Sequence, residues 1–144
     1  YLHFATHADL PGKVQGINEP FLLLGQMENE GKDDGFLTMS EVLDLKLDAD
    51  LVVLSACVTG KGKIMEGEGV SNFARAFHHA GARSVLVSLW EVASNETVEY
   101  MESFYRHIKQ GKTKSEALTL ARKEIKSKYP YPFYWAPFIL HGKG

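Results

Sequence analysis

The chain contains a single cysteine, Cys57, which directly follows an apolar run at residues 51–56, and His7 follows a second run at residues 1–6. Such runs are typical of buried β-strands, so each residue is expected just past the end of a strand. A free thiol is only slightly ionised at neutral pH. A nearby imidazole can take its proton or stabilise the thiolate as an imidazolium. The pair therefore predicts a nucleophilic Cys57 with His7 as its general base.

Both residues also have purely structural interpretations. Free cysteine is among the residue types most often buried in a core, and a histidine after a strand can cap a turn. If the pair is catalytic, the backbone N–H groups of Ala8 and Cys57 lie where an oxyanion hole is needed. The alternation of a strand puts His3 on the same side as His7, where it would line the cleft or pack.

The segment at residues 55–62 has some features of a phosphate-binding loop, because it follows a strand and contains Gly60 and Lys61. However, Ser55 replaces the first required glycine, and Gly62 replaces the hydroxyl residue that binds Mg²⁺. A nucleotide-binding α/β module is therefore disfavoured. The histidines lack zinc-ligand spacing, and one cysteine cannot form a thiolate cluster, so no metal or other cofactor is expected.

Composition limits the remaining classes of function. A net charge of −2 over 144 residues argues against nucleic-acid binding through a basic face. A lone cysteine suits a reducing compartment, so a cytoplasmic location is expected. The C-terminal lysines alternate with acids and are expected on a solvated helix face. No apolar stretch reaches the ~20 residues that cross a bilayer, so no membrane association is expected.

The periodicity predicts alternating strands and helices. Strands are expected at residues 1–6, 51–55, 84–89 and 135–140, with a hairpin arm or edge strand at 19–25. Capping boxes at Thr38–Glu41 and Thr113–Glu116 begin two helices. A stripe from Val70 ends at Gly81, and another helix, with Val98 and Met101 inward, ends at Gly111. The predicted fold is α/β, a mostly parallel sheet with helices on both faces, which places functional residues beyond the carboxyl ends of the strands.

Several segments, in order, resemble the CHAT domain, a caspase-like family often fused to TPR repeats. They are residues 4–8, 49–60, 67–70, 80–90, 104–105, 116–118 and 134–138. Caspases also carry a histidine about 50 residues before the cysteine. The resemblance implies a clan CD cysteine peptidase, a three-layer sandwich with Cys57 as nucleophile and His7 as general base. Peptide would lie across the strand ends, and the pocket for the residue before the scissile bond would involve Ser55, Trp90, Glu91 and Ser94.

The chain departs from the family pattern near both motifs. Val58 stands where members often have glutamate, and Ala93 and Ser94 stand where acidic residues are usual. A preference for basic substrate side chains is therefore in doubt, although Glu91 or Glu96 could substitute.

The resemblance also implies that residues 1–144 are one peptidase domain lacking its first strands. An upstream segment or TPR repeats would then complete the sheet beside residues 1–6. A bacterial origin is expected from the family's usual distribution. The leading prediction is an endopeptidase awaiting an activating partner, with the glycine-rich loop (Gly60, Gly62, Gly67, Gly69) as its switch. The alternative is a catalytically silent scaffold for protein–protein interaction.

Overall fold

The main sheet of the protein has four strands in the order β1-β5-β7-β8. The computed structural model describes all residues except 10, 13, 26–33, 56, 59–65 and 91–93. Three strands are parallel, and the last is an antiparallel edge: β1 (Leu2–Phe4), β5 (Val52–Leu54), β7 (Ser84–Ser88) and β8 (Phe138–Gly142). The mostly parallel sheet predicted from the sequence is confirmed.

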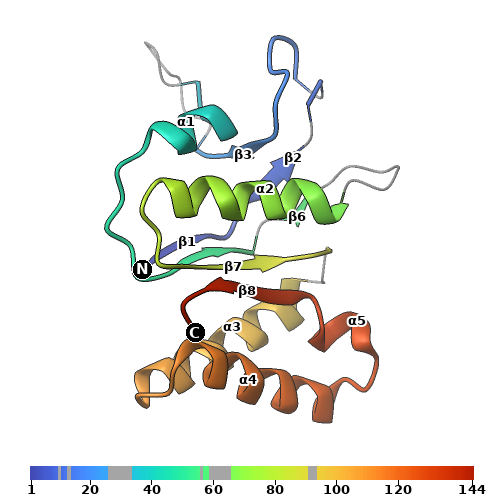
Figure 1. Ribbon diagram of the computed structural model, residues 1–144. Helices are drawn as coiled ribbons and strands as arrows, with labels where there is room; N and C mark the ends of the chain where they lie inside the picture. Colours follow the sequence, from blue (N-terminus) through green and yellow to red (C-terminus); the bar gives the residue numbers. More distant parts are fainter. Residues whose placement is uncertain (10, 13, 26–33, 56, 59–65, 91–93) are drawn as a thin grey trace.

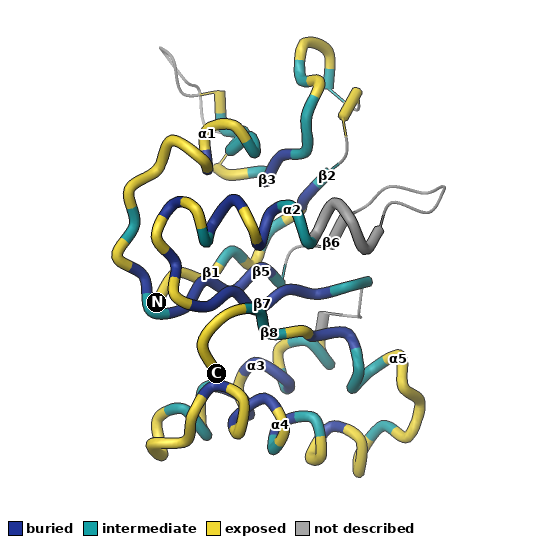
Figure 2. The backbone as a smooth tube through the Cα atoms, in the orientation of Figure 1, coloured by how far each residue is buried: buried dark blue, intermediate teal, exposed yellow. Residues whose placement is uncertain are grey.

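Helices cover both faces of this sheet, as expected (Figure 1). On one face, Val52, Leu54, Val85 and Val87 pack against helix α2 (Glu66–His79) in one core cluster. On the other face, alternate strand residues pack against helices α3 (Ser94–Lys109) and α4 (Lys114–Lys128) in a second cluster. Figure 2 shows the buried strands running between these two layers. The result is the three-layer arrangement of a caspase-like domain.

A second sheet lies beyond the carboxyl ends of β1 and β5. Its order is β4-β3-β2-β6, with β2 (His7–Asp9), β3 (Phe21–Leu23), β4 (Phe36–Thr38) and β6 (Cys57–Val58). The single strand expected at residues 1–6 is therefore wrong in its extent, because the pairing of β1 ends at Phe4. The Thr6 hydroxyl donates to the Leu23 carbonyl, which ties the chain to β3 instead. The hairpin arm expected at residues 19–25 is confirmed by the antiparallel β3–β4 pair.

Both predicted capping boxes are present. They begin helix α1 (Met39–Asp44) at Thr38 and helix α4 at Thr113. Helix α2, however, starts at Glu66, so Gly67 and Gly69 lie in a helix and not in the expected loop; Gly60 and Gly62 lie outside the described residues. Apolar periodicity could not detect this start, because the apolar stripe begins only at Val70.

Three expectations for the C-terminal half are corrected. Val98, expected inward, is 55% exposed, because α3 instead buries Tyr100, whose ring packs 4.7 Å from that of Phe138. Trp135 belongs to the short helix α5 (Pro132–Trp135), where proline favours a first helical turn, so β8 starts only at Phe138. Lys114 is not on a solvated face: it is 8% exposed, and its Nζ lies 2.9 Å from Oδ1 of Asp50.

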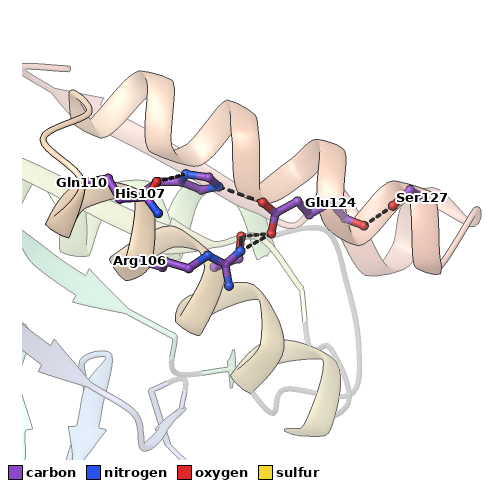
Figure 3. A network of polar contacts seen from close by, with 6 residues as sticks. Arg106, His107, Gln110, Glu124 and Ser127 are labelled. Atoms are coloured by element: carbon purple, nitrogen blue, oxygen red, sulfur yellow. Dashed lines mark hydrogen bonds and ion pairs between the residues drawn. The ribbon is translucent and has the colours of Figure 1, made fainter.

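A polar network joins α3 to α4 (Figure 3). Glu124 accepts a hydrogen bond from the Ser103 hydroxyl at 2.6 Å and lies 2.9 Å from Nε2 of His107; Arg106 also contacts it. The Ser103 hydrogen bond first, and then those from His107 and Arg106, lower the pKa of Glu124 to about 2. This network fixes the helical layer that supports the sheet. No helix in the described part of the chain is long and apolar enough to span a membrane.

Substitution of Gly81 should destabilise the protein far more than substitution of Gly111. Both glycines follow helices with positive φ, 112° and 82°. A Cβ at Gly81 would lie 2.1 Å from the Leu47 carbonyl oxygen, whereas one at Gly111 meets nothing within 4 Å. Gly111→Ala should therefore cost ~1 kcal/mol of unfolding free energy from the left-handed backbone. Gly81→Ala should cost about 3 kcal/mol or more, because overpacking is added. Urea denaturation tests the difference, and equal losses would contradict it.

The Glu124 network should stabilise the protein only above acidic pH. The pKa of Glu124 falls from an ordinary 4.5 to about 2 on folding, so its contribution is present above 4.5 and lost as pH falls towards 2. The side chain is 45% exposed, so screening limits the effect to about 1 kcal/mol. Denaturation of Glu124→Gln should show this loss at pH 7 and little difference at pH 2. The exposed Glu102→Gln is the control, and a pH-independent difference would count against this account.

Candidate active site

The structure brings the backbones of His7 and Cys57 together. Strands β2 and β6 are parallel, with His7 opposite Cys57 and Ala8 opposite Val58. Neighbouring strands lie about 4.8 Å apart, so two residues fifty positions apart in sequence become adjacent. His7 is exposed, and the side chain of Cys57 lies outside the described part. Both residues were expected just after a strand; each instead begins a short strand of the second sheet.

The main sheet determines this adjacency. In β1 and β5, Leu2, His3 and Phe4 pair in register with Val52, Val53 and Leu54. The same two segments then cross into the second sheet and pair again. His7 lies three positions after Phe4, and Cys57 lies three positions after Leu54. Equal spacing on parallel segments carries the register of the first sheet into the second.

Ala8, a predicted oxyanion donor with Cys57, is 2% exposed in β2, between β3 and β6. Its burial beside β6 is established, and the role of its N–H group stays a prediction. The same holds for the Cys57 N–H group, whose residue starts β6.

Ser55, a predicted pocket residue, is half-buried at the carboxyl end of β5 and contacts a histidine. Its Oγ lies 2.9 Å from Nε2 of His3 and donates to the Phe4 carbonyl at 3.4 Å. Nδ1 of His3 lies 3.1 Å from the Tyr105 hydroxyl, and the two rings are 5.7 Å apart. Burial lowers the pKa of His3 and raises that of Tyr105 to about 12. Both side chains are therefore neutral at pH 7.

Trp90 lies past the end of the neighbouring strand β7, and its side chain is fixed by α5. Its Nε1 donates to the Phe133 carbonyl at 2.9 Å, and the two rings stack at 6.4 Å with 26° between their planes. The Ser88 hydroxyl donates to the Trp90 carbonyl at 2.7 Å. Figure 1 shows α5 at the end of the sheet where β7 points. Trp90 is therefore held at the carboxyl edge, as the sequence predicted.

The remaining pocket candidates are less well defined. Glu91 lies outside the described residues, as does Ala93. Ser94 is the first residue of α3, and its side chain is not described. Glu96, a possible substitute acid, lies in the first turn of the same helix. The structure thus places Ser55 and Trp90 at the ends of adjacent strands and leaves the other two as predictions.

Tyr105 is the site residue that the sequence did not reveal. Its position in the apolar stripe of α3 predicted a core residue, and it does pack against the core. Its hydroxyl, however, reaches His3 across 102 residues of sequence. The amphipathic character of tyrosine was the available signal, because a buried ring usually directs its hydroxyl to a polar partner. Among the described residues, no group of three or more His, Cys, Asp or Glu side chains is arranged to hold a metal.

Comparison with known proteins agrees with this geometry. The CHAT domain family matches residues 1–143. Human tetratricopeptide repeat protein 28 is 39% identical over 108 residues, and its mouse counterpart 36% over the same length; each match covers 74% of this chain. The matched region is 4% of either relative, so the chain spans a small part of their length.

These relatives bear out the association with tetratricopeptide repeats that the motifs suggested. Both are mammalian, so they give no support to the expected bacterial origin. The family match covers almost every residue, including the segments of His7 and Cys57. Together with the three-layer fold, it shows that the chain belongs to the CHAT domain family.

Proposed function

We propose that this chain is a cysteine endopeptidase domain in which Cys57 and His7 form the catalytic dyad. The observation that carries the proposal is the in-register pairing of His7 with Cys57 between β2 and β6. A thiol needs a neighbouring base to be reactive at neutral pH. This pairing brings the one cysteine of the chain beside an exposed imidazole, in the second sheet beyond the carboxyl ends of β1 and β5.

In the proposed mechanism, His7 takes the proton of the Cys57 thiol, and the thiolate attacks the carbonyl carbon of a peptide bond. The N–H groups of Ala8 and Cys57 stabilise the oxyanion, a contribution of about 3 kcal/mol per donor. His7 then protonates the leaving amine, which leaves an acyl-enzyme on Cys57. Water attacks this thioester with His7 as base, which releases the second product and restores the thiol. No cofactor takes part.

Substrate peptide would lie across the carboxyl ends of β5 and β7. Ser55 and Trp90 flank this position on adjacent strands, and Glu91 and Ser94 would complete the pocket. The stacking of Trp90 on Phe133 supports a preformed wall, because the indole is held by both a ring contact and a hydrogen bond. Which side chain is preferred depends on the segment at residues 91–93.

A scaffold role is the second candidate. Two observations support it. Both relatives are named for tetratricopeptide repeats. Within the described part of the chain, β1 has a neighbouring strand on one side only. Tyr1 is 60% and Leu2 37% exposed along this edge. An upstream segment or the repeats would complete the sheet there, and an activating partner could act through the same contact.

Cleavage of peptides should depend on both members of the dyad. In the full-length protein, Cys57→Ala and His7→Ala should each lower kcat/KM at least about 10³-fold, because the members of a catalytic unit fail together. His79→Ala, at the exposed end of α2, is the matched control and should retain activity. A peptide library read by mass spectrometry measures this and gives the cleavage preference.

The same experiment separates the two candidate functions. Products that appear with wild type and disappear with Cys57→Ala establish the peptidase. Cleavage that survives in Cys57→Ala would refute the dyad. No cleavage by any variant, even with purified partners of the full-length protein, would favour the scaffold.

The edge of β1 should be covered in the full-length protein. Leu2 donates its N–H to the Leu51 carbonyl at 3.0 Å. Successive residues of a strand direct their N–H groups to opposite edges, so the His3 N–H points away from β5. If another strand completes the sheet, hydrogen exchange at His3 should be as slow as at Leu2. Residue-resolved exchange measures this, and a fast His3 amide beside a protected Leu2 would contradict the proposal.

A further inference from the structure

The two segments that carry the proposed dyad pair in the main sheet and again in the second sheet. Strands β1 and β5 end at Phe4 and Leu54, and their segments pair again only at His7 and Cys57. Among the described residues, strand pairing between the two segments is recorded before and after this gap, at Phe4 with Leu54 and at His7 with Cys57. Any interaction that joins the two segments here controls how His7 approaches Cys57.

A series of linked side-chain hydrogen bonds lies at this gap. It runs from the Tyr105 hydroxyl on α3 to Nδ1 of His3 at 3.1 Å, and from Nε2 of His3 to Oγ of Ser55 at 2.9 Å. It returns from the Ser55 hydroxyl to the Phe4 carbonyl at 3.4 Å. Helix α3, the end of β1 and the end of β5 are thus connected two residues before Cys57.

One proton arrangement satisfies all three contacts with an uncharged imidazole. The Tyr105 hydroxyl donates to Nδ1, the Nε2–H group of His3 donates to Ser55, and the Ser55 hydroxyl donates to the Phe4 carbonyl. In this arrangement the imidazole carries its proton on Nε2 and the phenol is protonated. Partial desolvation favours both states, because it lowers the pKa of the otherwise exposed His3 and raises that of Tyr105 to about 12.

We propose that the Tyr105–His3–Ser55 chain is a positioning device that sets the spacing between the segments of His7 and Cys57. The proposal rests on the dyad proposed above. Tyr105 and His3 act through Ser55 and the backbone, and neither is a catalytic group. Helix α3 anchors the device, because Phe104 and Tyr100 hold it against the sheet in the core.

Alkylation of Cys57 by iodoacetamide tests the device without any peptide substrate. The rate follows the thiolate fraction, so its pH profile gives the thiol pKa, and mass spectrometry restricts the readout to Cys57 in the full-length protein. Tyr105→Phe should slow alkylation at pH 7 about tenfold, because looser pairing with His7 raises the thiol pKa by about one unit. His3→Leu, which breaks both contacts, should shift the profile at least as far.

Tyr129→Phe is the matched control. Its hydroxyl donates to Glu99 of α3 at 3.1 Å, so this variant also loses a tyrosine hydrogen bond in the helical layer, but one that involves neither His3 nor Ser55. Its alkylation profile should equal that of wild type. Equal profiles for Tyr105→Phe, Tyr129→Phe and wild type, with a lowered thiol pKa in all three, would overturn the device and leave the dyad intact. An ordinary thiol pKa of about 8.5 in wild type would overturn the device, and the cleavage experiment above then decides the dyad, because a general base can act on a thiol of ordinary pKa.

Discussion

The register between β1 and β5 is the constraint on which the rest of this domain depends. Parallel pairing fixes Phe4 opposite Leu54, and equal lengths of chain then bring His7 opposite Cys57. A slip of one residue would turn every side chain of a strand to the other face. Both faces of β5 are buried against different helices, so such a slip would expose apolar residues on either side. The cores therefore protect the register that assembles the site.

The two helical layers have different tasks around this sheet. Helix α2 packs on one face through Phe73 and Phe77. The α3–α4 layer holds the opposite face. The Glu124 network joins its two helices to each other, and Lys114 of α4 contacts Asp50, just before β5. From this layer Tyr105 reaches the strand ends. The same pair of helices thus contributes both to the core and to the contacts at the strand ends.

Membership of the CHAT domain family agrees with this architecture. Because relatives of this chain are named for tetratricopeptide repeats, such repeats are one candidate partner for the exposed edge of β1. An edge strand with unpaired backbone groups is a template for another strand. In this chain it lies beside the segment that leads to His7. A contact made at this edge would therefore act on the strand that carries the proposed base, which offers a physical route for regulation.

The sequence by itself determined the α/β class, the buried strands and both capping boxes, and it singled out one cysteine and one histidine near strand ends. These are local signals, because apolar runs, capping residues and glycine stops act within a few residues. Only the tertiary structure decided that residues 1–6 divide at Phe4, that Lys114 is buried, that Tyr100 replaces Val98 in the core, and that Tyr105 reaches His3. Each depends on contacts between distant segments, and local periodicity contains no information about which distant side chain will be the partner.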